Sequence, residues 1–168
     1  MGWKANITVA HPKKYIICLA PHTSNLDFLI GQLFARAENM TSGFLMKKDW
    51  FFWPLGPILK KLGGIPVWRN KKTSMTDRLA EMARKAENFS ICITPEGTRS
   101  DWKLGFYFIA QKANIPILLY GVDYERKLIE CTKMIVPTGD VENDIREIKL
   151  YFKNYKGKKP ELFTTGDV

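Results

Sequence analysis

A histidine and an aspartate follow a short apolar run, Tyr15–Ala20, and lie close together in the sequence as His22 and Asp27. Inside one helix their side chains would lie about 140° apart and could not touch. We expect instead that a helix begins at Ser24 or Asn25, so that the preceding loop folds the imidazole back onto the carboxylate. A carboxylate on one ring nitrogen fixes the tautomer and leaves the other nitrogen as a general base.

The same two residues also have a purely structural interpretation. Many histidines in proteins simply lie in surface loops, and an acid in the first turn of a helix is favourable in any protein. For His22 and Asp27 taken alone, this interpretation is the more common one. Metal binding is not expected, because two ligands are too few and His11 is the only other histidine.

A polar turn, TPEGTRS, begins at the end of a second buried run, Ser90–Thr94. The guanidinium of Arg99 has the planar set of donors that suits a phosphate. Gly97 lets the backbone approach a ligand closely, and Glu96 could orient the guanidinium or accept a hydrogen bond from a hydroxyl. An ordinary turn with a local ion pair is the alternative.

A third segment, Leu62–Asn70, places two glycines before an extended stretch that ends in Arg69. Arg69 is a second candidate phosphate ligand, with a solvated surface arginine as the equal alternative. Lys103 is a further cationic candidate, for which surface charge is the simpler interpretation.

The segment Trp50–Lys61 combines four consecutive aromatic residues, two prolines and two terminal lysines. Exposed, it would place aromatic rings at the level of lipid headgroups with lysines nearby. Buried, it would form a wall of the core or of an apolar ligand pocket. The sequence favours neither interpretation.

Apolar periodicity predicts strands that alternate with helices. Strands are expected at Tyr15–Ala20, Gly43–Met46, Ile65–Trp68, Ser90–Thr94, Ile117–Val122 and Lys127–Val136. Helices are expected at Leu26–Asn39, Thr73–Phe89, residues 106–113 and residues 141–155, the last with Asp140 as N-cap and Gly157 past its end. This order predicts an α/β fold: one domain over residues 1–168, with a mixed, largely parallel sheet covered by helices. Sites in such sheets lie at the carboxyl ends of strands.

Composition narrows the class of protein. The chain has 168 residues, 45% of them hydrophobic, and a net charge of +9, so it is globular and attracts polyanions. We find no signal peptide and no stretch near the roughly 20 apolar residues of a spanning helix. Three scattered cysteines predict neither a disulfide framework nor a zinc site.

Four segments in order resemble the lysophospholipid and glycerol-phosphate acyltransferases, the PlsC-like enzymes. The H-x4-D block of that family is similar to His22 and Asp27, and its Gly-containing block that ends in Arg is similar to Gly63–Arg69. Its F-P-E-G-T-R-S block is similar to Pro95–Ser100, with Thr94 in place of Phe, and its block around a proline is similar to Ile115–Leu118. The resemblance covers residues 21–118.

The resemblance implies a role for each residue. His22 would deprotonate an acceptor hydroxyl that attacks a thioester, and Asp27 would hold the imidazole. The expected substrate-binding residues, which would grip the acceptor phosphate and shape its pocket, are Arg69, Glu96, Gly97, Thr98, Arg99 and Lys103. No cofactor is expected, since acyl-CoA or an acyl-carrier protein serves as the donor. The expected partners are that donor, a phosphorylated lysolipid and an anionic membrane surface, at the cytoplasmic face and without nucleic acid.

Two other functions fit parts of the pattern. The first is acyl transfer to another acceptor, such as glycerol 3-phosphate, a different lysolipid or an aminolipid. The second, more remote, is a basic module without catalytic activity that binds membranes or nucleic acid. Against the second, the lysines are dispersed and no aromatic RNA-binding strand or zinc finger is present.

Overall fold

The computed structural model describes residues 2–67, 74–95 and 102–166 of the chain. Seven strands lie within these ranges: β1 (Lys4–Ile7), β2 (Lys14–Ala20), β3 (Gly43–Lys47), β4 (Gly64–Val67), β5 (Phe89–Ile93), β6 (Ile117–Asp123) and β7 (Leu128–Ile135). They form one sheet in the order β1-β7-β6-β2-β5-β3-β4. Neighbours from β6 to β4 are parallel, whereas β6 and β7 are antiparallel. The predicted mixed, largely parallel sheet is confirmed.

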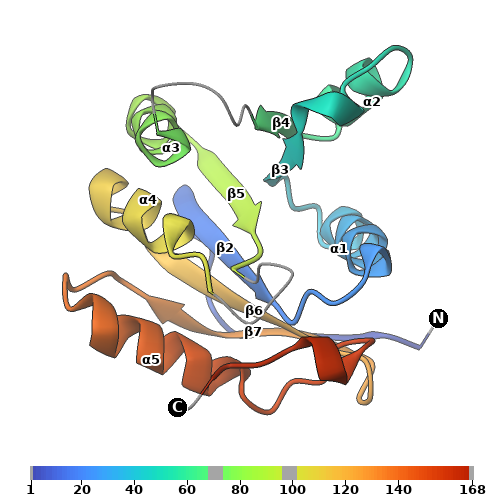
Figure 1. Cartoon of the computed structure of the whole chain (residues 1–168), viewed down its shortest axis with the longest axis vertical. Coiled ribbons are helices and arrows are strands. Elements are labelled where there is room, and N and C mark those ends of the chain that lie inside the picture. Colours follow the sequence, from blue (N-terminus) through green and yellow to red (C-terminus); the bar gives the residue numbers. More distant parts are fainter. Residues whose placement is uncertain (1, 68–73, 96–101, 167–168) are drawn as a thin grey trace.

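Helices lie on both faces of this sheet (Figure 1). The longer ones are α1 (Asn25–Ala37), α3 (Met75–Lys85), α4 (Gly105–Ala113) and α5 (Val141–Phe152), and the shorter ones are α2 (Leu55–Lys61) and the 3-10 turns η1 (Lys48–Trp50) and η2 (Pro160–Leu162). Helices α3, α4 and α5 cover one face, and α1 lies on the other. No helix within the described ranges is long and apolar enough to cross a bilayer.

The two faces of β2 show how the sequence builds the core. Ile16 and Cys18 pack against α3, α4 and α5, whereas Tyr15 and Ile17 face the side of α1. Successive side chains in a strand point to opposite faces, so a continuous apolar run is what a strand with both faces covered requires. The predicted buried strand at Tyr15–Ala20 is therefore confirmed.

The parallel strands bring several loops to one edge. β2, β5, β3 and β4 run in the same direction, so Ala20, Ile93, Lys47 and Val67 all lie at the same edge of the sheet. The His22 loop leaves from this edge. In a sheet of this kind the carboxyl edge is where binding sites form.

Two predicted helix ends were wrong, and one strand was missed. The helix expected to reach Phe89 ends at Lys85, and Phe89 instead begins β5. The prediction failed because the apolar ring of Phe89 fits both the helical spacing before it and the apolar run of the strand after it. The helix expected over residues 141–155 begins after Asp140 as predicted but stops at Phe152, with Lys153 as its C-cap. Strand β1 was not predicted, because an exposed edge strand lacks an apolar run.

Candidate active site

The imidazole of His22 lies against the carboxylate of Asp27 as the sequence predicts. Nδ1 of His22 is 3.3 Å from Oδ2 of Asp27. The carboxylate is completely buried, whereas 32% of the histidine side chain is exposed. Since Nδ1 itself is buried, the exposed part of the ring lies away from the aspartate. The imidazole lines the adjacent groove, and Nε2 is the ring nitrogen that is not turned toward Asp27.

The same aspartate holds the start of α1. Ser24 is the N-cap, and its side chain accepts a hydrogen bond from the backbone N–H of Leu26. In return, the backbone N–H groups of Thr23 and Ser24 each donate to Oδ2 of Asp27 at 2.8 Å. This is a capping box, which satisfies backbone donors that have no partner within the helix. The arrangement fixes the loop on which His22 lies.

Asp27 remains ionised despite its burial. Burial alone raises the pKa of a carboxyl group, but the contact with His22 and hydrogen bonds from Tyr124 and from the backbone of Ser24 and Thr23 outweigh it. The pKa of Asp27 is therefore lower than its ordinary value. A negative charge beside Nδ1 favours the proton on that nitrogen and leaves Nε2 as the ring nitrogen with a lone pair.

Tyr124 is a third member of the site that the sequence did not reveal. It follows β6, and its hydroxyl donates a hydrogen bond to Oδ1 of Asp27 across 97 positions of the chain. Its ring packs edge-on against Trp3, with the centroids 5.0 Å apart. Burial, and then the hydrogen bond to Asp27, raises the pKa of Tyr124, so its hydroxyl stays protonated and donates. Tyr124 positions Asp27 and does not itself reach the groove.

We expect Tyr124→Phe to weaken the site without abolishing it. Removing one donor to a buried carboxylate costs about 1–2 kcal/mol of stability and lowers kcat about 3- to 10-fold, because Asp27 is held less firmly. The pKa of Asp27 should rise toward its ordinary value, since a group that stabilises the ionised form is gone. A carboxyl-carbon NMR titration measures this rise, and an unchanged pKa of Asp27 would contradict the positioning role.

The segment that follows α5, residues 156–159, packs against the His22 loop and is hydrogen-bonded to it. Lys159 donates its backbone N–H to Oγ1 of Thr23 at 3.1 Å, and the N–H of Tyr124 donates to the carbonyl of Lys156 at 2.9 Å. A methyl group added at Gly157 would lie 2.7 Å from Oγ1 of Thr23 and 3.1 Å from Cβ of Pro21. Only glycine allows this close approach.

Gly157→Ala should therefore damage the site from a distance. The methyl group forces the Pro21–Thr23 loop to move, and such misplacement lowers kcat about tenfold or more. Gly105→Ala is the matched control, because a methyl group there would meet only Oγ1 of Thr76, at 3.9 Å. Steady-state kinetics on both variants check this, and equal effects of the two changes would refute it.

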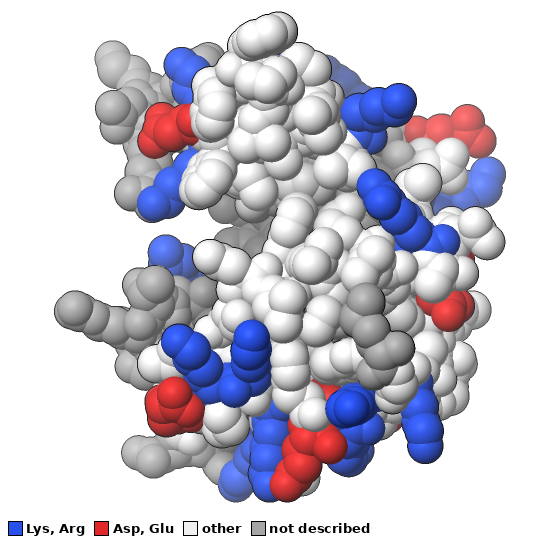
Figure 2. All heavy atoms as spheres, turned by 90° about the vertical axis from the view of Figure 1, so that its right-hand side faces the viewer, with Lys and Arg blue, Asp and Glu red and all other residues white. Residues whose placement is uncertain are grey.

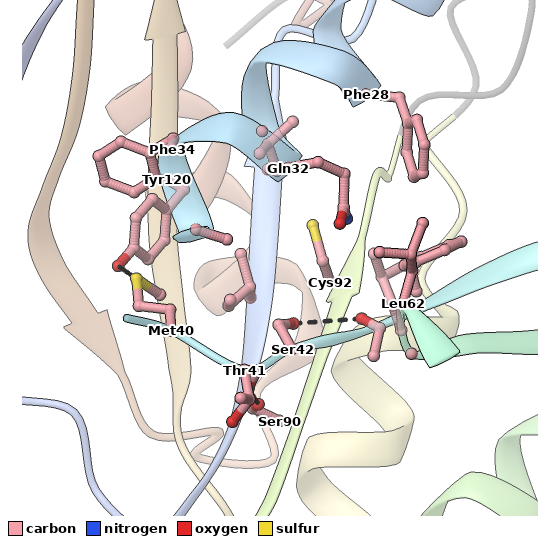
Figure 3. Close-up of a pocket in the computed structure, with 18 of the residues that line it drawn as sticks. Phe28, Gln32, Phe34, Met40, Thr41, Ser42, Leu62, Ser90, Cys92 and Tyr120 are labelled. Atoms are coloured by element: carbon pink, nitrogen blue, oxygen red, sulfur yellow. Dashed lines mark hydrogen bonds between the residues drawn. The ribbon is translucent and has the colours of Figure 1, made fainter. Parts of the chain in front are cut away.

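A groove of about 1420 Å³ opens beside His22, between α1 and the face of the sheet formed by β2, β5 and β6. Asp27 and His22 line one end and His11 lines the other. The groove therefore follows β2, whose 7 residues span about 20 Å at about 3.3 Å per residue. Figure 3 shows Gln32 and Cys92 pointing into it. Apolar and aromatic residues flank them on both sides: Phe28 and Leu62 on one, and Phe34, Met40 and Tyr120 on the other.

Two polar groups inside the groove bear on its chemistry. At its far end, Nε2 of His11 lies 2.6 Å from the hydroxyl of Tyr120, which in turn contacts the sulfur of Met40. At its middle, burial raises the pKa of Cys92 to about 12. This cysteine is a neutral thiol at physiological pH, and a thiol is a poor nucleophile compared with a thiolate.

Most of the expected substrate-binding residues lie outside the described residues. These are Arg69, Glu96, Gly97, Thr98 and Arg99. Lys103 is described and exposed, and its backbone N–H donates to the carbonyl of Pro95 at 2.7 Å. Within the described ranges, no group of three or more His, Cys, Asp and Glu side chains could hold a metal ion.

The segment Trp50–Lys61 has both buried and exposed side chains. Trp50 and Lys61 line the groove, and Leu59 is buried. Trp53 lies at the other extreme, with 86% of its surface exposed. The segment is thus a wall of the groove on one side and an exposed aromatic projection on the other.

Comparison with known proteins identifies the family. A family model with the description Acyltransferase matches residues 4–120. Neither the curated proteins nor the solved structures gave a match. The matched residues contain the His22 loop, α1 and most of the groove, whereas Tyr124 and Gly157 lie beyond them. The site at the start of α1 lies within the matched residues, and the chain belongs to the acyltransferase family.

Proposed function

We propose that this acyltransferase is a PlsC-like enzyme that moves a fatty acyl group from acyl-CoA or an acyl-carrier protein to the free hydroxyl of a lysophosphatidate-like glycerolipid. The observation that carries the proposal is the contact of His22 with the buried, ionised Asp27 at the mouth of a long apolar groove. The base and the groove lie together where both substrates must meet.

The proposed reaction begins with the acceptor hydroxyl. Nε2 of His22 takes its proton as the oxygen attacks the thioester carbonyl, and the negative charge of Asp27 stabilises the imidazolium that forms. The tetrahedral intermediate then collapses, the carbon–sulfur bond breaks, and the leaving thiolate receives the proton from His22. The products are an ester and a free thiol.

The groove suits a fatty acyl chain. Its walls are mostly apolar, and it follows a strand about 20 Å long, which is the length scale of an extended long-chain acyl group. Burying a methylene group stabilises binding by about 0.8 kcal/mol, so an extended chain gains substantial affinity. The carbonyl carbon would then lie near His22.

We favour direct transfer of the acyl group from the thioester to the acceptor hydroxyl over a mechanism with an acyl-enzyme intermediate. Cys92 is the cysteine that lines the groove, and burial raises its pKa to about 12. The described residues next to His22 provide a neutral serine and threonine, Ser24 and Thr23, whose side-chain oxygens are already engaged with backbone N–H groups. We therefore assign the attack to the acceptor hydroxyl itself, which needs only a general base.

The acceptor phosphate is assigned to the two arginines of the sequence motifs. Strands β4 and β5 end at the same edge of the sheet as β2, so the chain proceeds toward Arg69 and Arg99 from the edge that carries His22. Two guanidiniums would hold a phosphate and orient the attacking hydroxyl. The assignment rests on sequence and topology.

The test is a thioester-consumption assay across a set of acceptors. Purified protein is incubated with a long-chain acyl-CoA and, in separate reactions, with lysophosphatidate, glycerol 3-phosphate, a lysolipid with a different headgroup and an aminolipid. Release of free thiol should be fastest with lysophosphatidate and should require the acceptor. Faster release with another acceptor would replace the proposed substrate, and no release with any of them would refute the function.

A further inference from the structure

Helix α1 exposes leucines where a surface helix normally exposes polar residues. Leu26, Leu29 and Leu33 are all exposed, and their spacing places them on one side of the helix. None of the three lines the groove. The acid of this helix, Asp27, is buried and faces the other way. The outer side of α1 is therefore apolar and without negative charge.

The η1–α2 projection carries a second group of exposed apolar side chains. Trp50, Phe52, Trp53 and Ile58 are each more than half exposed. Tryptophan and phenylalanine are the residues that anchor proteins at the level of lipid headgroups. Exposed apolar groups gathered on one projection mark an interaction site rather than ordinary surface.

Both groups lie on one side of the molecule. Figure 1 shows α1 and α2 on the same side of the sheet, and Figure 2 turns that side toward the viewer. Its upper and middle parts carry few charged side chains, and lysines and arginines, with acidic side chains among them, lie along its margins (Figure 2). The projection contributes three exposed lysines, Lys48, Lys60 and Lys61, against one exposed acid, Asp49, and the exposed Lys47 precedes it at the end of β3.

We propose that this side is a membrane-contact face that binds the surface of an anionic bilayer, formed by Leu26, Leu29, Leu33, Trp50, Phe52, Trp53 and Ile58. The apolar side chains enter the headgroup region, and the flanking lysines pair with anionic lipids. A second copy of the chain is a less suitable partner for this face than a bilayer. A symmetric dimer through this face would bring the lysines of both copies together, and only Asp49 of each projection could offset them.

The face also explains how a lipid would reach the site, a point that rests on the proposed function. Trp50 belongs to the face and also lines the groove that ends at His22. Leu26 and Asp27 are adjacent on α1, one exposed and one buried. An acceptor whose chain stays in the bilayer would therefore present its headgroup hydroxyl beside the imidazole.

Vesicle co-sedimentation with the full chain tests the face. The probes are neutral phosphatidylcholine vesicles and vesicles with added phosphatidylglycerol, each at low and high salt. The variants are Leu33→Ser and Trp53→Ser, neither of which lines the groove. Leu150→Ser is the matched control, because Leu150 is 45% exposed against 42% for Leu33 but lies on α5, on the opposite face of the sheet.

We expect the wild type to bind the anionic vesicles, more weakly at high salt. Leu33→Ser and Trp53→Ser should each reduce the partition coefficient about tenfold, and Leu150→Ser should leave it unchanged. No binding by the wild type, equal binding by all variants, or an equal loss in Leu150→Ser would overturn the proposal. So would a wild-type dimer in solution that Leu33→Ser converts to a monomer.

A second readout separates this proposal from the proposed function. Acyl transfer is measured with a short-chain acceptor free in solution and with a long-chain acceptor embedded in anionic vesicles. If both proposals hold, Leu33→Ser keeps the first activity and loses most of the second. Vesicle binding without transfer to either acceptor would refute the function alone, and transfer to both acceptors without vesicle binding would refute the face alone.

Discussion

His22→Ala should lower kcat by about 10²- to 10⁴-fold while leaving the fold intact. The change removes the proposed base, and no other described histidine lies near it, since His11 is at the far end of the groove. The loop should persist, because Asp27 still accepts hydrogen bonds from the backbone of Thr23 and Ser24 and from Tyr124. Single-turnover kinetics with a thioester substrate measure the effect.

His11→Ala provides the matched control for this loss. His11 also lines the groove, but it contacts Tyr120 and lies far from the acid of the site. With a short-chain thioester, whose chain does not reach the far end, kcat should stay within a few-fold of the wild type. Near-wild-type turnover by His22→Ala, or equal losses in the two variants, would rule out the imidazole of His22 as the base.

Asp27→Asn should lower kcat by on the order of 10²-fold with little damage to the structure. An asparagine oxygen in place of Oδ2 can still accept from the backbone of Thr23 and Ser24, and its NH₂ can donate to the hydroxyl of Tyr124. The negative charge beside His22 is what disappears. The imidazolium that forms during proton transfer then loses its stabilising partner.

The pH dependence of stability gives an independent check on Asp27. Its pKa in the folded protein is lower than its ordinary value, which is about 3.9 in the unfolded chain. Ionised Asp27 therefore stabilises the fold fully above the unfolded pKa, and this stabilisation is lost as the pH falls through the lower folded pKa. Urea unfolding should show a stability gap between wild type and Asp27→Asn that is largest at neutral pH and shrinks in acid. A gap that does not change with pH would contradict the ionised state.

Local patterns predicted most of the fold because its central strands β2 and β6 are buried on both faces and its helices are amphipathic. Patterns were insufficient where two periodicities overlap. Phe89 continues the helical spacing of α3, yet its backbone pairs with Lys14 in β2. Strand β1 carries the letters KANI, of which three residues are exposed, so nothing in its composition distinguishes it from a loop.

In the site, too, some residues could be predicted from the sequence and others could not. His22 and Asp27 lie in one short segment, and the capping rule that places a helix start at Ser24 also brings the two together. Tyr124 and Gly157 could not be found in this way, because each acts on that segment through the tertiary fold. A tyrosine after a strand and a glycine after a helix have many ordinary explanations, and only the packed chain selects one.

The capping box at the start of α1 gives one carboxylate two tasks, since Asp27 both secures the first helical turn and faces the imidazole. Fraying of that single turn would release the aspartate and the His22 loop together. Heat inactivation should then begin below the temperature at which the whole domain melts, because activity depends on the most local unfolding event in the helix. Stabilising this turn would extend the working temperature range of the enzyme more than stabilising the core beneath it.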